Sequence, residues 1–128
     1  MKKIFTVDVM VKGKKEKVDL ACDCEAISIT IECFGGARKT YFEKDFYKCF
    51  AALRKDNCDW VFYCKGAKTN VHPSSMASQM SLGLKAYELV IGKEPSKDDL
   101  VFIFDYEDKD LTSDPDRQRQ FYLSWITS

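Results

Sequence analysis

The most informative segment for the fold is MKKIFTVDVMVKGKKEKVDLACDCEAISITIECFGG, residues 1–36. Its run IFTVDVMV (residues 4–11) is rich in β-branched and aromatic side chains, which favour strands. KGKK (residues 12–15) predicts a turn, because Gly13 adopts a positive φ without steric cost. Two alternating runs follow, and each places its apolar residues on one face of a strand. These residues are Val18, Leu20, Cys22 and Cys24, and then Ile27, Ile29, Ile31 and Cys33. The first 40 residues therefore predict an antiparallel meander.

A change of period marks a helix in EKDFYKCFAALRKDN (residues 43–57). Its apolar side chains recur at helical spacing and form one face: Phe46, Cys49, Phe50 and Leu53. The apolar run DWVFYCKG (residues 59–66) predicts a central strand. LVFIFDYE (residues 100–107) predicts a strand that is either central or covered on both faces. LKAYELVI (residues 84–91) predicts a further strand with Tyr87, Leu89 and Ile91 on one side.

A short helix is expected after the only histidine-proline pair. Ser74 or Ser75 would cap it, and Gly83 would end it. Met76 and Met80 lie one turn apart in this helix. Core packing is their expected role, and a soft contact surface for a partner is the alternative.

The last helix begins after Ser113 or Asp114, with Pro115 near its first position. Its apolar face is Phe121, Tyr122, Trp125 and Ile126. The whole pattern predicts one α+β domain over residues 1–128. It would hold a mostly antiparallel sheet of about five or six strands, with two longer helices packed on it.

Composition narrows the class of protein. An apolar fraction of 45% indicates a folded globule, and no apolar run is long enough to cross a membrane. The N-terminus lacks the apolar segment of a signal peptide, so we expect a cytoplasmic protein. The chain has six cysteines, and we expect them to be reduced thiols rather than disulfides or a zinc site. They are Cys22, Cys24, Cys33, Cys49, Cys58 and Cys64.

Catalytic patterns are weak along the chain. His72 stands beside Pro73 and two serines, but catalysis also needs an orienting third group and an oxyanion site, which no motif marks. We therefore expect His72 to be a partly exposed turn residue, and we expect no cofactor and no metal.

Charge is distributed unevenly, although 20 basic and 20 acidic side chains balance. Residues 1–68 carry a net charge of +4, and residues 69–128 carry −4. The basic residues are scattered, so direct nucleic-acid binding, which needs clustered positive charge, is not expected.

The acids are concentrated in DYEDKDLTSDPD, residues 105–116. The six acids are Asp105, Glu107, Asp108, Asp110, Asp114 and Asp116. Asp114 and Asp116 suit the start of a helix, and the other four have no such role. The stretch departs from an EF-hand loop, because no glycine stands at position 113. A solvated loop, the carboxylates of a small metal-dependent hydrolase or nuclease, and a docking surface for a basic partner are the three hypotheses.

Two segments also resemble a known family. KGAKTNVHPSSMASQMSLGLKAYEL (residues 65–89) and LVFIFDYE (residues 100–107) are similar to segments of bacterial immunity proteins from contact-dependent growth inhibition and Rhs-type polymorphic toxin systems. The resemblance implies a cytoplasmic, non-enzymatic protein that binds one cognate toxin C-terminal domain and blocks it. Many such toxins are basic nucleases, which would suit an acidic surface.

The shared segment would then be scaffold, and the six acids of residues 105–116 would form the toxin interface. Membrane binding is not expected, and the chain would be a monomer or a weak homodimer. A structural subunit that assembles through an exposed sheet edge is the remaining alternative.

Overall fold

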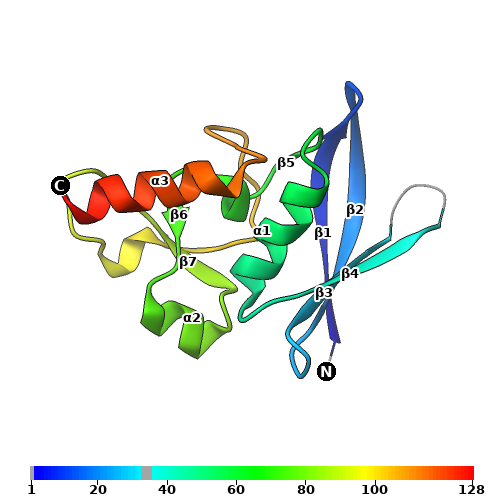
Figure 1. Ribbon diagram of the computed structural model, residues 1–128, viewed down its shortest axis with the longest axis horizontal. Coiled ribbons are helices and arrows are strands. Elements are labelled where there is room, and N and C mark those ends of the chain that lie inside the picture. The colour runs from blue at the N-terminus through cyan, green and yellow to red at the C-terminus, as the bar shows by residue number, and fades with distance from the viewer. Residues whose placement is uncertain (1, 33–35) are drawn as a thin grey trace.

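A computed structural model describes residues 2–32 and 36–128 of the chain, and the predicted inward-facing Cys33 lies outside these ranges. The fold is α+β, as predicted, with its strands in two antiparallel sheets (Figure 1). None of the helices in the described residues is long and apolar enough to cross a membrane.

The predicted meander forms most of a five-stranded sheet with the order β4-β3-β2-β1-β5. Its members are β1 (Lys2–Val11), β2 (Lys14–Asp23), β3 (Ser28–Glu32), β4 (Arg38–Phe42) and β5 (Val61–Phe62). The β1–β2 hairpin closes through Lys12 and Gly13, which both have positive φ, so the turn matches the twist of the strands. The alternating residues of β1 to β3 face inward and are buried: Val7, Val9, Val18, Leu20, Cys22, Ile29 and Ile31.

Helix α1 (Phe46–Asp56) packs on the inner face of this sheet and lies between the two sheets (Figure 1). Asp45 caps it by accepting a hydrogen bond from the Lys48 backbone N–H at 2.7 Å. The predicted face is confirmed, because Phe46, Cys49, Phe50 and Leu53 have no exposed surface.

The second sheet has the order β6-β7-β8, with β6 (Val71–His72), β7 (Lys85–Glu88) and β8 (Leu100–Phe102). The short helices η1 (Lys65–Ala67), α2 (Ser75–Ser81) and η2 (Lys97–Asp99) connect the strands of this half. Ser74 caps α2, as predicted, by accepting a hydrogen bond from the Ala77 N–H at 3.0 Å. Helix α3 (Pro115–Ile126) begins after Asp114, whose side chain accepts from the Asp116 N–H.

Both predicted central strands are wrong in extent. β5 is only two residues long and lies at the edge of its sheet, because the chain turns into η1 at Lys65. β8 ends at Phe102, where the Asp105 N–H closes a turn onto the Phe102 carbonyl. Ile103 and Phe104 are nevertheless buried, so their apolar character reflects core packing within a turn. The strand of residues 84–91 is likewise shorter than predicted, and Ile91 is half exposed.

The other corrections concern side chains. Met76 and Met80 are 69% and 80% exposed, so the expectation that they pack in the core is wrong. His72 lies in β6, not in a turn, and its ring stacks on Tyr122 with centroids 4.1 Å apart. Burial lowers the pKa of this imidazole. On α3, Ile126 is exposed and the buried residue is Gln118.

Candidate partner interface on the acidic loop

Residues 105–116, the acidic loop, run alongside residues 63–69 and are tied to them by backbone hydrogen bonds. The N–H of Lys65 donates to the Asp105 carbonyl at 2.8 Å, and the N–H of Thr69 donates to the Asp110 carbonyl at 2.8 Å. In the other direction, the Thr112 N–H donates to the Ala67 carbonyl at 2.9 Å. The loop is therefore held along its length in one conformation, although it contains no helix or regular strand before α3.

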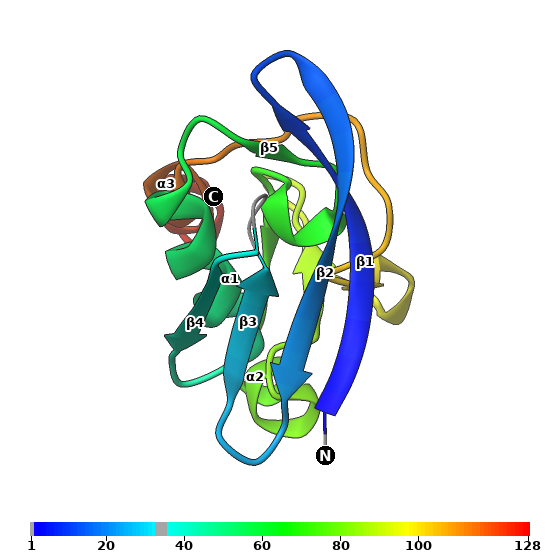
Figure 2. The same ribbon diagram turned by 90° about the vertical axis from the view of Figure 1, so that its right-hand side faces the viewer.

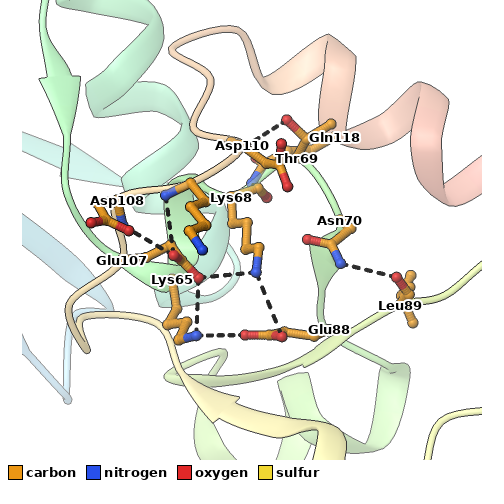
Figure 3. A network of polar contacts seen from close by, with 11 residues as sticks. Lys65, Lys68, Thr69, Asn70, Glu88, Leu89, Glu107, Asp108, Asp110 and Gln118 are labelled. Atoms are coloured by element: carbon orange, nitrogen blue, oxygen red, sulfur yellow. Dashed lines mark hydrogen bonds and ion pairs between the residues drawn. The ribbon is translucent and has the colours of Figure 1, made fainter.

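Glu107 is the one predicted interface residue that points inward. Its side chain is 9% exposed and lies between Lys65 and Lys68, each with its ammonium 3.0 Å from Oε1 (Figure 3). Oε2 accepts the N–H groups of Asp108 at 3.0 Å and Lys109 at 3.1 Å. Glu88 of β7 completes the group through Lys65 at 2.7 Å and Lys68 at 3.7 Å. The group beneath the loop thus contains equal numbers of carboxylate and ammonium groups, two of each.

This buried pairing controls the ionisation of Glu107. Desolvation alone would raise the pKa of its carboxyl, but the hydrogen bonds from Lys68, Lys65 and the loop backbone outweigh it and lower the pKa to about 2. The pKa of Lys65 is raised, first by its hydrogen bond to Glu88. Glu107 and Lys65 are therefore charged at neutral pH, and Glu107 acts as an anchor of the loop.

The other five predicted residues are exposed and form what we call the acidic surface: Asp105, Asp108, Asp110, Asp114 and Asp116. None of the five takes part in an ion pair among the described residues, where the side chains of Asp8, Asp56, Glu88 and Glu107 are the paired acids. Asp110 holds a left-handed conformation with φ 55°, which short polar side chains tolerate. The acidic surface thus remains available to a partner.

An aromatic side chain accompanies these acids, and the sequence patterns do not mark it. Tyr106 is 53% exposed and lies almost parallel to Tyr63, with ring centroids 6.2 Å apart. The Lys15 ammonium, from the start of β2, lies 5.2 Å from the Tyr106 ring centroid and donates to its hydroxyl at 3.3 Å. These contacts join the β1–β2 hairpin to the loop. Exposed tyrosines held in place are frequent energetic centres of protein interfaces.

The sequence also did not identify the partners of Glu107, which are Lys65, Lys68 and, through these lysines, Glu88. The two lysines stand at the start and end of η1 and Glu88 lies in β7, so they meet Glu107 only through the fold and no local spacing connects them with residue 107. The only available signal is the two lysines of KGAK (residues 65–68), which precede an acidic segment by some forty positions.

For the metal-dependent alternative, the ligand geometry is the relevant observation. Among residues 2–32 and 36–128, no group of three or more His, Cys, Asp or Glu side chains is arranged to hold a metal ion. No protein-family model matches the chain, and no curated protein gives a significant match.

Proposed function

We propose that this chain is a cytoplasmic immunity protein that neutralises a toxin domain by binding it through the acidic surface. The observation that carries the proposal is the contrast between Glu107 and its neighbours. One acid is buried and neutralised by lysines, which anchors the loop. Five acids are left exposed on that fixed loop, outside any ion pair of the described residues.

This arrangement suits a basic protein partner. A carboxylate surface increases the rate of association with a positively charged domain and disfavours acidic competitors. Because the loop is already ordered by its backbone hydrogen bonds, binding would cost little conformational entropy. Tyr106 would supply apolar contact area within the charged surface. A basic nuclease is the partner class that fits these features, and the inhibition would need no catalytic residue in this chain.

The test is co-expression with the C-terminal domain of a candidate toxin from the same genome, followed by capture through a tag. We expect a stoichiometric complex for the wild type. The variant Asp105→Asn/Asp108→Asn should bind at least about tenfold more weakly, because it removes two exposed charges while keeping the side-chain size.

Glu94→Gln/Asp98→Asn is the matched control, since both residues are exposed and lie outside the acidic loop. This control should bind as the wild type does. Equal affinity of all three folded proteins would place the interface elsewhere. The absence of a complex with every basic candidate toxin domain would contradict the proposed function itself.

A further inference from the structure

The second surface with an unusual arrangement is the β4 edge of the five-stranded sheet. β4 pairs with β3 over all five of its residues, and no described strand pairs with its other side. At the far edge of the sheet, β5 leads directly into Tyr63 and Cys64, which pair with the acidic loop. The two edges therefore differ, because one is continued by the chain itself and the other is presented to solvent (Figure 2).

The two faces of β4 are also different. Lys39 and Tyr41 point to the inner face, where both bind the Asp56 carboxylate at the end of α1. Arg38, Thr40 and Phe42 point to the outer face and line an open hollow of about 520 Å³. Phe42 is 64% exposed there, which is unusual for a large aromatic side chain in a strand.

The sequence of β4, Arg-Lys-Thr-Tyr-Phe, is complementary to itself when read in the antiparallel direction. A two-fold axis at Thr40 places Thr40 opposite Thr40 of a second copy, Arg38 opposite Phe42, and Lys39 opposite Tyr41. Every basic residue would then face an aromatic ring, which is a favourable cross-strand combination. The Thr30–Thr40 pair within the chain already shows a hydroxyl contact of 2.8 Å between facing threonines.

Neighbouring registers lack this complementarity. An axis at Lys39 would place two lysines in direct opposition, and an axis at Tyr41 would place Arg38 opposite Lys44. Shifting the pairing by a single residue would put the inner face of one sheet in line with the outer face of the other. The charge pattern of the strand thus selects the register centred on Thr40.

We propose that β4 pairs with β4 of a second copy of this chain, which would join the two five-stranded sheets into one continuous sheet. The surface is small, so the dimer is weak and its population depends on concentration. The acidic loop follows the opposite edge of the sheet, and both copies keep it accessible. The inference is independent of the proposed toxin partner.

The experiment is sedimentation equilibrium of the full chain over a concentration series, with two variants at one position. The wild type should rise from its monomer mass of 14.7 kDa toward twice that value. Phe42→Lys places a cation opposite Arg38 of the second copy and should weaken the dimer about tenfold. Phe42→Glu places an anion there and should strengthen it by a similar factor. Position 42 is exposed, so both variants should unfold at nearly the wild-type temperature.

Ile4→Lys is the control, because Ile4 is 66% exposed on the same outer face but belongs to β1. It should leave the wild-type mass unchanged. Three results would overturn the proposal: a wild type that stays monomeric at every concentration, a dimer that responds in the same direction to both charges at position 42, or a dimer lost in Ile4→Lys and kept in Phe42→Lys. Binding of the toxin domain is read separately and decides nothing about this dimer.

Discussion

Glu107 shows how a single buried carboxylate can make stability depend on pH. Its pKa in the folded protein is about 2, against 4.5 as its ordinary value. A depressed pKa contributes stability that is fully present above about pH 5. That stability is lost as pH falls through the range between the two values, because the unfolded chain then binds the proton first.

Glu107→Gln should therefore lower the free energy of unfolding by about 2 kcal/mol at pH 7, allowing for the partial solvent exposure of the two lysines. The difference from wild type should shrink toward pH 2. Urea unfolding at a series of pH values measures it, with Glu94→Gln as the exposed control. A difference that is constant over the whole pH range would contradict this account of the network.

Arg54 is a buried cation, and none of the ion pairs among the described residues includes it. Its guanidinium, 1% exposed, donates to Gln118 Oε1 at 2.5 Å and to the Gly66 carbonyl at 3.2 Å. Burial lowers its pKa. Gln118 in turn donates to the carbonyls of Gly66 and Lys68, so one pair joins α1, η1 and α3.

Gln118→Leu should lower the free energy of unfolding by about 3 kcal/mol, because it leaves the buried Arg54 guanidinium without its main hydrogen-bond acceptor. The double variant Arg54→Leu/Gln118→Leu should lose much less free energy of unfolding than Arg54→Leu and Gln118→Leu lose in sum. Denaturant unfolding of the three variants gives the coupling, and Gln120→Leu on the exposed side of α3 is the control. Additive costs would show that the two side chains do not act as a pair.

At the scale of elements, the turn after α2 depends on a glycine for two reasons. Gly83 has φ 80°, and a Cβ built on it would lie 2.8 Å from Asp45 Cγ and 2.9 Å from the Tyr47 nitrogen. Leu82 beside it accepts the Phe46 N–H at the start of α1 with its carbonyl. The sequence predicted this glycine as a helix stop, but the contact with the cap of α1 appears only in the fold.

Gly83→Ala should therefore destabilise the protein by roughly 3 kcal/mol, combining the strain of a positive φ with the clash. Gly92→Ala is a matched control: φ is 79° and no atom lies within 4 Å of the added Cβ. It should cost only about 1 kcal/mol. Thermal unfolding of both variants compares them, and equal losses would mean that the contact with Asp45 relaxes freely.

The elements also show where periodicity was informative. The period-2 runs of β1 to β3 and the helical face of α1 were predicted correctly, because each buries one face against a single core. The strands predicted for residues 59–66 and 100–107 were too long. A continuous apolar run indicates that a segment is buried, but it does not specify the backbone conformation. For Met76 and Met80 the error was the opposite one. Their spacing is that of an amphipathic helix and predicted burial, but α2 has no buried residue.

At the scale of the whole molecule, three cysteine thiols are buried in the core, so their accessibility to reagents indicates whether the core is closed. Burial raises the pKa of Cys22 and of Cys64 to about 12, and that of Cys49 to about 11. Each has no exposed surface, whereas Cys58 is exposed. The five cysteines of the described residues form no disulfide with one another.

A water-soluble disulfide reagent should accordingly modify Cys58 within seconds to minutes, while Cys22, Cys49 and Cys64 react only at the rate of global unfolding. Mass spectrometry of the peptides after timed quenching identifies each site. Early modification of Cys22 or Cys64 in the folded protein would show that the two sheets separate without complete unfolding.

Four properties of this protein can be predicted from the amino-acid sequence: the α+β class, the N-terminal meander, the face of α1 and the acidic character of residues 105–116. These properties follow from local spacing and composition, which act through the nearest residues of the chain. The burial of Glu107 between Lys65 and Lys68, with its five acidic neighbours exposed, becomes visible in the folded protein alone. The physical reason is that desolvation and ion pairing depend on which distant segments come together in space, and the spacing of charges along the chain carries no record of that.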